Sequence, residues 1–333
     1  MAFIVDGSEW CFDDWSAAAI DEALGILFER IRVARSRGER VWIEDDLQNR
    51  PVLGALSVWE LWSPDCPVRL PLELHQELAA ALGTVYRYLD ENDWPPGMED
   101  AQVRIEQEPI EENSGMGWAH HNVRAGRAVV CLGLQRSGVF PTHSASGSAD
   151  VHWVTDEQGH RKFFRAAISV EHDNEETIQR LAPHAYPDVF FLEQVWRGLS
   201  DFKGGYAAVR RELQRHLALY DDHGRWIFTA PPPSETEEDS RQAPGQTPDQ
   251  RLIQRRFELR GLDVAPEKPD VASDRSSRQA RERQLNGTTL YCHWHGKIEL
   301  HINRIHIHSP VPESDGKLIV AIFHAHLPLP GKR

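Results

Sequence analysis

The amino-acid sequence changes character abruptly after residue 230. Between residues 231 and about 286, large apolar side chains are scarce, and proline, serine, glutamine and charged residues take their place. A segment of this composition buries too little apolar surface to offset the entropy that ordering costs. The sequence therefore predicts an α/β (α+β) N-terminal domain over residues 1–230, a disordered linker over 231–286, and a small antiparallel β module over 287–333. Within the linker, residues 252–259 are the one candidate for a short amphipathic helix.

Charge and targeting signals narrow the environment in which the chain works. A formal net charge of −14 gives no bulk attraction to nucleic acid or to anionic membranes, so any contact with RNA needs a local basic patch. The N-terminus has no signal-peptide pattern, and no apolar run approaches the roughly 20 residues that span a bilayer. The cysteines Cys11, Cys66, Cys131 and Cys292 are scattered and form no CxxC pair. We therefore expect a cytoplasmic protein with no membrane partner.

The first 230 residues alternate between strand-like and helix-like patterns. Residues 3–5, 41–43 and 128–134 are apolar runs of strand length. Ser16 is a typical helix N-cap, and Gly38 is a typical end for the helix that follows it. Further along the chain, helical patterns at 177–181, 190–196 and 206–219 are followed by a predicted turn at 221–224. This alternation is typical of an α/β domain.

The C-terminal module is rich in histidine. Seven of the chain's 17 histidines lie between His293 and His326. They include three His-x-His pairs, which are His293/His295, His306/His308 and His324/His326. Residues 290–298, 302–308 and 317–326 are strand candidates, and side chains two apart on a strand share a face. In an antiparallel meander, Lys297 would therefore lie on the face of His295, and Arg304 on the face of His306 and His308.

Two kinds of chemistry fit this face, and a solvated polar surface is the third interpretation. In the first, Lys297 and Arg304 hold an RNA phosphate while one histidine removes the 2′-hydroxyl proton and another protonates the leaving oxygen. Histidine suits both steps because its ordinary pKa is about 6.5. In the second, the histidine pairs bind zinc together with Cys292. Cys292 and His295 point to opposite sides of a regular strand, so the sequence predicts no bound zinc and no other cofactor.

Short motifs in the module resemble a known superfamily. The runs Trp294-His295-Gly296-Lys297 and Asn303-Arg304-Ile305-His306-Ile307-His308, and the strand that ends at His326-Leu327, resemble the C-terminal sheet of RelE/HigB-type toxins. The resemblance covers about 45 residues and implies a metal-free ribonuclease. It implies that Lys297 and Arg304 bind phosphate and that His306 or His326 acts as acid or base. Strand parity adds His308 to the catalytic candidates. Lys297 is a catalytic candidate as well as a predicted phosphate ligand.

Two weaker candidates lie in the N-terminal domain. His120 and His121 precede Arg124 and Arg127, which suggests a phosphate or nucleotide site, although the start of a strand with a solvated loop is the favoured interpretation. Asp6, Asp45 and Asp46 follow two strand candidates, where carboxylates can hold Mg²⁺. Acidic residues at turns and helix caps are commoner, and that interpretation is favoured here too.

Two functions remain open. The first is a bacterial toxin-like or anti-phage-defence ribonuclease, with RNA as its substrate and a regulatory or partner-binding domain ahead of it. In support, residues 163–165 and 181–187 loosely resemble bacterial proteins encoded near phage-defence genes. The second is a non-catalytic accessory protein that binds a partner protein of the same defence system. Convergence of Lys297, Arg304 and His306 on one exposed face would favour the first.

Overall fold

The computed structural model describes residues 1–44, 46–88, 102–105, 108–109, 115–230 and 248–331. It divides into unit 1, Met1–His172, and unit 2, Asp173–Arg333. The predicted mixed α/β fold with antiparallel strands at the C-terminus is confirmed. None of the helices described is both long enough and apolar enough to cross a membrane.

Unit 1 is built on one mixed sheet whose strands run in the order β5-β2-β1-β8-β10-β9-β6-β7. Strands β5, β2, β1, β8 and β10 pair in parallel, and β9, β6 and β7 extend the sheet in antiparallel fashion. Its elements in chain order are β1 Ala2–Val5, η1 Gly7–Glu9, α1 Ala17–Ser36, β2 Arg40–Glu44, η2 Leu47–Asn49, β3 Pro51–Leu53, β4 Leu56–Ser57, η3 Val58–Trp62, α2 Leu72–Leu82, β5 Tyr86–Tyr88, β6 Val103–Ile105, β7 Glu108–Pro109, α3 Gly115–Arg124, β8 Val129–Leu132, β9 Gly138–Ser144, β10 Gly147–Val154 and α4 Glu157–Val170.

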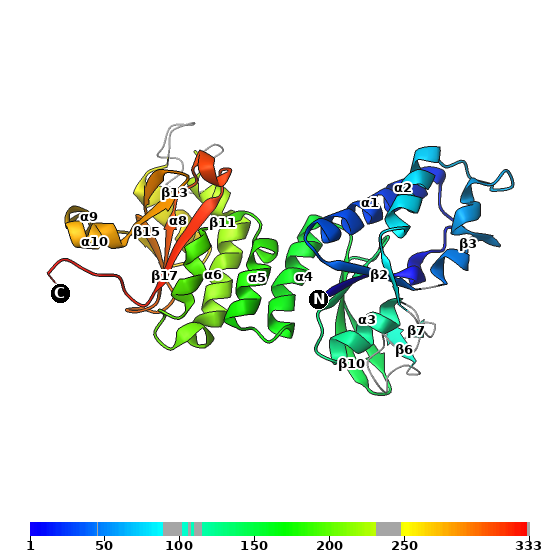
Figure 1. Cartoon of the computed structure of the whole chain (residues 1–333), viewed down its shortest axis with the longest axis horizontal. Helices are drawn as coiled ribbons and strands as arrows, with labels where there is room; N and C mark the ends of the chain where they lie inside the picture. The colour runs from blue at the N-terminus through cyan, green and yellow to red at the C-terminus, as the bar shows by residue number, and fades with distance from the viewer. Residues whose placement is uncertain (45, 89–101, 106–107, 110–114, 231–247, 332–333) are drawn as a thin grey trace. The chain divides into compact units, whose positions relative to one another are not determined.

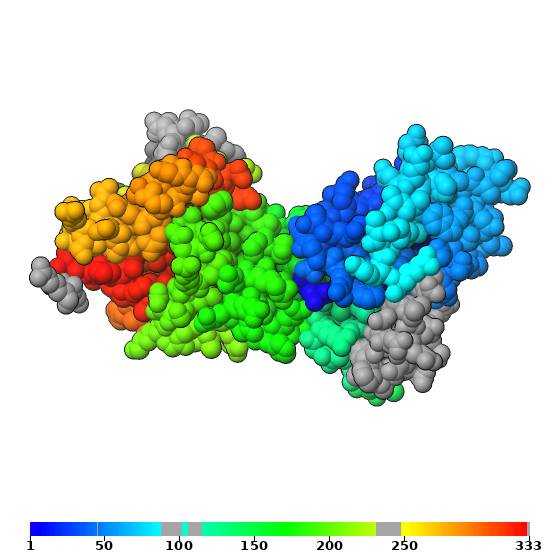
Figure 2. All heavy atoms as spheres, in the orientation of Figure 1, coloured from blue at the N-terminus to red at the C-terminus, as the bar shows by residue number. Residues whose placement is uncertain are grey.

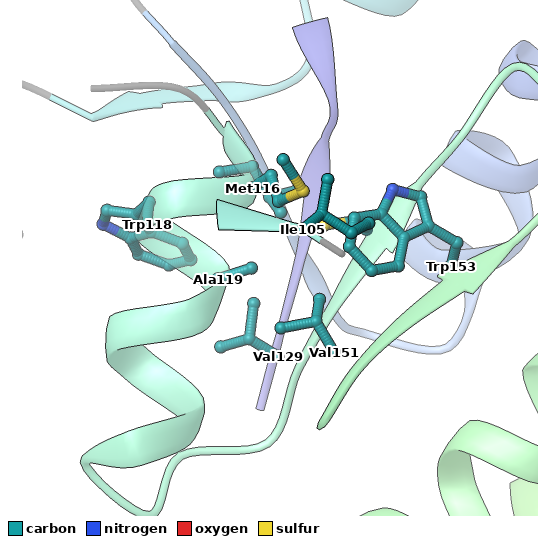
Figure 3. Packing of buried hydrophobic residues seen from close by; sticks show 9 residues of the cluster. Ile105, Met116, Trp118, Ala119, Val129, Val151 and Trp153 are labelled. Carbon is teal, nitrogen blue, oxygen red and sulfur yellow. The ribbon is translucent and has the colours of Figure 1, made fainter. Parts of the chain in front are cut away.

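Local signals account for much of unit 1. The Ser16 side chain accepts a hydrogen bond from the Ala19 backbone and caps α1, and Gly38 adopts a positive φ of 77° just after that helix, as predicted. One face of the sheet is covered by α3, whose Met116, Trp118 and Ala119 pack against strand residues that include Val129, Val151 and Trp153 (Figure 3).

Unit 2 is built on a five-stranded sheet in the order β11-β17-β16-β15-β12. The predicted meander is present as the antiparallel strands β15, β16 and β17. It is extended by β12, antiparallel to β15, and by β11, parallel to β17. The elements are α5 Glu175–Ala185, β11 Val189–Phe191, η4 Glu193–Leu199, α6 Gly205–Phe228, α8 Gln250–Leu259, β12 Val264–Pro266, α9 Pro269–Ser273, α10 Arg275–Ala280, β13 Glu282–Leu285, β14 Thr288–Tyr291, β15 Trp294–Lys297, β16 Arg304–His308, η5 Pro312–Ser314 and β17 Leu318–His324.

The boundaries differ from those that the sequence predicted. The division falls after residue 172 rather than 230, and residues 173–230 belong with the C-terminal sheet. Residues 248–286, predicted as linker, carry α8, β12, α9, α10 and β13. The helix expected at 252–259 is present as α8. The rest of the predicted linker, residues 231–247, lies outside the described residues.

Helix α6 shows why the C-terminal module is not separate. It runs unbroken through residues 221–224, where the sequence predicts a turn, because Tyr220, Gly224 and Ile227 form one buried helical face. At Gly224 an added Cβ would lie 3.1 Å from the Leu318 Cβ, so α6 lies close against β17. Figure 1 shows α5 and α6 beside this sheet, and Figure 2 shows the atoms of residues 173–230 against the yellow-to-red atoms of the C-terminal part.

The other helical pattern that the structure corrects is at residues 190–196. These residues form the end of β11 and the start of the 3-10 helix η4 rather than an α-helix. Val189, Phe190 and Phe191 pair with β17, which offers an unpaired edge to a short apolar segment. Pairing with a strand more than a hundred residues away therefore overrides the local pattern.

Gly296 offers a direct test of this packing. An alanine Cβ there would lie 2.3 Å from the Tyr220 hydroxyl oxygen and 3.2 Å from Cδ2 of His216, both on α6. We expect Gly296→Ala to lower the free energy of unfolding by about 1–3 kcal/mol, because an overpacked core must shift. Urea titration measures the loss. Gly25→Ala, in α1 with no atom within 4 Å of the added Cβ, is the control and should leave stability equal or higher. Unchanged stability of Gly296→Ala would contradict the close contact.

Candidate functional site

Unit 2 contains a pocket of about 450 Å³ that is lined in part by residues of β12, β15 and β16. The C-terminal segment after β17 forms part of its wall. The lining residues are Ala265, Pro266, Glu267, Lys268, Asp270, Val271, Arg281, His295, Lys297, Arg304, His306, His326, Leu327, Leu329 and Pro330. Imidazoles, cationic side chains and one buried carboxylate therefore meet in one concave site.

Strand register explains how the central side chains come together. His295 of β15 is directly opposite His306 of β16, and their ring centroids are 5.7 Å apart. Ala265 of β12 is the partner of His295 on the other side of β15. Glu267 is two residues after Ala265 and therefore returns to the same face. The residue just after β12 and the strands β15 and β16 thus contribute Glu267, His295 and His306, which we call the Glu-His-His cluster.

A buried arginine holds the carboxylate of this cluster. Nε of Arg281 donates a hydrogen bond of 2.7 Å to Oε1 of Glu267, and both side chains are at most 5% exposed. Arg281 also donates to the carbonyl oxygens of Ser277 and Pro328, so its position is set by the backbone. Burial raises the pKa of the Glu267 carboxyl, but contacts with His295 and Arg281 outweigh burial and lower this pKa to about 2. Glu267 is therefore an anion at neutral pH.

The two imidazoles face the same oxygen without bonding to it. Nδ1 of His295 lies 3.3 Å and Nδ1 of His306 lies 3.5 Å from Oε1 of Glu267. Neither contact has hydrogen-bond geometry, and both ring nitrogens of His306 are buried without a hydrogen bond to any described residue. The His306 side chain is only 2% exposed. Burial, with a smaller contribution from His295, holds the pKa of His306 well below its ordinary value, so its ring is neutral.

The structure brings four of the five predicted site residues into the pocket. His306, His326, Lys297 and Arg304 line it, and Lys297 is directly opposite Arg304 in the β15–β16 pair. His308 is not among the lining residues. Its Nδ1 instead lies 2.7 Å from the carbonyl oxygen of Ser309.

The two predicted phosphate ligands already have protein partners. Nζ of Lys297 donates to both carboxylate oxygens of Asp263, at 2.8 and 2.9 Å. The Arg304 guanidinium is directed at the loop before β16, where it donates to carbonyl oxygens of Glu299, Leu300, Ile302 and Asn303. Arg304 therefore orders this loop, and phosphate binding by Arg304 stays a prediction. The ion pair of Lys297 with Asp263 is exposed, so an RNA phosphate could replace Asp263 as the partner of Lys297.

His326 is differently arranged. Its Nδ1 lies 2.9 Å from the carbonyl oxygen of Leu327. A carbonyl oxygen only accepts, so Nδ1 carries the hydrogen and Nε2 of the neutral ring carries the lone pair. A histidine held in this tautomer is prepared to accept a proton at Nε2.

The histidine pair of unit 1 is part of a buried helix. Residues 118–121 lie in α3 rather than at the start of a strand, and His120 contacts Thr142 Oγ1 at 2.7 Å and Ser144 Oγ at 3.0 Å. Burial, with smaller contributions from His121 and Arg124, lowers the pKa of His120 to about 4. The contacts with hydroxyl groups of β9 therefore give His120 a structural role, which is to join α3 to the sheet.

The acidic residues of unit 1 also have structural partners. Asp6 accepts hydrogen bonds from the Ser8 backbone and from Nε1 of Trp153, at 3.0 and 2.8 Å. Asp46 forms an ion pair with Arg50, and Asp45 lies outside the described residues. Within the described part of the chain, the Glu-His-His cluster is the one group of three or more His, Cys, Asp or Glu side chains whose ligand atoms all lie within 4.8 Å of one another.

Sequence reasoning missed Glu267 and Arg281 because both lie in the stretch assigned to the linker. A usable signal was present, since Leu262 and Val264 alternate at strand spacing shortly before Glu267, and both are buried. The same reasoning placed His295 on the correct face but considered it only as a zinc ligand together with Cys292, an alternative that it did not favour. The site is described from its own geometry, because no family model, no curated protein and no solved structure matches this chain.

Proposed function

We propose that unit 2 cleaves RNA and that the pocket is its active site. The observation that carries this proposal is the convergence of His295, His306 and His326 with cationic side chains around one pocket of about 450 Å³. Lys268, Arg281, Lys297 and Arg304 line it, whereas the whole chain carries a net charge of −14. Such a local cationic site is what an acidic protein needs to bind a phosphodiester.

The proposed reaction is attack by a ribose 2′-hydroxyl on the adjacent phosphorus. Nε2 of His326 takes the hydroxyl proton, and the 2′ oxygen forms a bond to phosphorus. The bond from phosphorus to the 5′ oxygen breaks, a water molecule of the pocket protonates that oxygen, and the hydroxide formed takes the proton from Nε2 of His326. The products are a 2′,3′-cyclic phosphate and a 5′-hydroxyl. Lys297 and Lys268, which both line the pocket, attract the phosphate.

The sequence supports a biological role and a cellular location for this activity. The resemblance of the C-terminal strands to RelE/HigB-type toxins supports a toxin-like role in antiviral defence. Scattered cysteines, all four of them free, support a cytoplasmic location. Unit 1 would then be the regulatory or partner-binding part.

One observation favours the accessory function as the second candidate. Lys297 and Arg304 are both bonded to protein groups, as expected if this face is structural. An accessory protein would bind a partner protein without cleaving RNA.

Replacing His326 separates the two functions. We expect the full chain to cleave single-stranded RNA and His326→Gln to slow cleavage by about 10²–10⁴-fold, the usual effect of removing a positioned base. Gel analysis of an end-labelled strand gives the rates, and the cyclic phosphate identifies the chemistry. A strand with a 2′-deoxy nucleotide at the cut site should resist cleavage.

The matched control is His301→Gln, an exposed histidine outside the lining of the pocket, which should cleave at the wild-type rate. Cleavage of the 2′-deoxy site, or equal rates for His326→Gln and the wild type, would exclude the proposed mechanism. Absence of cleavage by the wild type would leave the accessory function in its place.

A further inference from the structure

We propose that Glu267, His295 and His306 form a binding site for one divalent transition-metal ion, with zinc as the best-matched ion. The pattern of His-x-His pairs with Cys292 led to the opposite expectation, because it does not complete a ligand set. The structure supplies the missing ligand, Glu267, directly after β12, a strand in the supposed linker. The inference goes beyond the proposed RNA cleavage and does not depend on it.

Ligand spacing is the first argument. Zinc binds imidazole nitrogen and carboxylate oxygen at about 2.0–2.2 Å, so two ligands at tetrahedral angles lie roughly 3.3–3.5 Å apart. The distances from Oε1 of Glu267 to Nδ1 of His295 and Nδ1 of His306 are 3.3 and 3.5 Å. Hydrogen bonds between such groups are shorter, at about 2.7–3.2 Å. The separation thus matches ligands around an ion better than a histidine–carboxylate hydrogen bond.

Unsatisfied buried nitrogens are the second argument. His306 is 2% exposed, and neither of its ring nitrogens has a hydrogen-bond partner among the described residues. Nδ1 of His295 is also buried without such a partner. Buried polar atoms in folded proteins are nearly always paired, so these nitrogens point to a missing partner. An ion between Nδ1 of His295 and Nδ1 of His306 would supply it for both rings.

Support around the ligands is the third argument. Metal-binding carboxylates are usually oriented by a further hydrogen bond, and Arg281 gives one to Glu267 at 2.7 Å. Arg281 is itself held by two backbone carbonyls. The carboxylate is therefore already held in position, which reduces the reorganisation that binding requires.

The ligand set also indicates the class of ion and its use. Two imidazoles and one carboxylate suit zinc and related transition metals, and hard ions such as Mg²⁺ prefer oxygen ligands. Three protein ligands beside an open pocket leave a coordination position for water or a phosphate oxygen, as in catalytic zinc sites. Cys292 is excluded as a ligand because it lies fully buried in the apolar core with Leu290 and Ile319.

The site is tested by treating the full chain with a chelator to remove bound metal, removing the chelator, and titrating the chain with Co²⁺ and then with Zn²⁺. We expect one Co²⁺ per chain, seen by its visible absorption, and displacement by one Zn²⁺. His295→Ala should weaken binding by more than about 100-fold, since loss of a supporting residue alone costs 10–100-fold. His295 is partly exposed and has no hydrogen bond at Nδ1, so this variant should fold, which circular dichroism checks.

His308→Ala is the matched control, because His308 lies on β16 outside the pocket, and it should bind one ion as the wild type does. No bound ion in the wild type, or unchanged affinity in His295→Ala, would overturn the inference. An ion that binds to a chain inactive on RNA would uphold the metal site and refute the proposed function. RNA cleavage by a chain that binds no ion would uphold the proposed function and refute the metal site.

Discussion

Replacing Arg281 with methionine is expected to destabilise unit 2 by about 3–5 kcal/mol, the usual cost of removing one partner from a buried ion pair. Arg281 and Glu267 are 3% and 5% exposed, so the carboxylate left behind has little access to water. The guanidinium also joins the end of α10, at the Ser277 carbonyl, to the C-terminal segment at Pro328. Its loss therefore removes a charge partner, a local hydrogen bond to α10 and a tertiary hydrogen bond to Pro328 together.

Urea unfolding of the full chain measures this effect. Arg278→Met is the matched control, because Arg278 forms an exposed ion pair with Glu282, and such pairs contribute at most about 1 kcal/mol. The double variant Arg281→Met, Glu267→Gln should recover much of the stability, since it leaves no unpaired buried charge. A loss for Arg281→Met no larger than that of the control would show that the pair does not hold the pocket together.

Lowering the pH from 7 to 5 is expected to destabilise unit 1 by about 2 kcal/mol for each of two buried histidines, His120 and His160. Burial is the main cause that lowers the pKa of His120 to about 4 and that of His160 to about 3, and nearby positive charges add to it. In the unfolded chain both groups titrate near 6.5. Between that value and the folded pKa the unfolded state binds more protons, so stability falls as the pH falls.

Hydrogen exchange of unit 1 amides in the full chain, followed by mass spectrometry at pH 7 and 5 and corrected for intrinsic rates, measures the change. His160→Asn removes one titrating group and should reduce the pH-dependent loss by about 2 kcal/mol, whatever its effect at pH 7. His301→Asn, at an exposed position, should retain the full dependence. Equal stability of wild-type unit 1 at both pH values would refute the assignment.

Local patterns were enough for much of the architecture. Apolar runs located β1, β2 and β8, and residue types at helix ends located α1 between Ser16 and Gly38. Strand parity also placed Lys297 and Arg304 on one face, and the register of β15 and β16 confirms it. These features depend on residues within a few positions of one another, where side-chain periodicity and capping act directly.

The sequence by itself therefore determined the fold class and which face carries the histidines. Only the tertiary structure decided what completes that face, because β12 brings Glu267 to His295 through pairing with β15, 30 residues further along the chain. The same holds for β11, whose partner β17 is separated from it by more than a hundred residues. Composition averaged over residues 231–286 hides α8 and β12, which need few apolar residues of their own. Leu252, Phe257 and Val264 are all buried, and Phe257 meets the rings of Tyr220 and Trp294, which lie in α6 and β15.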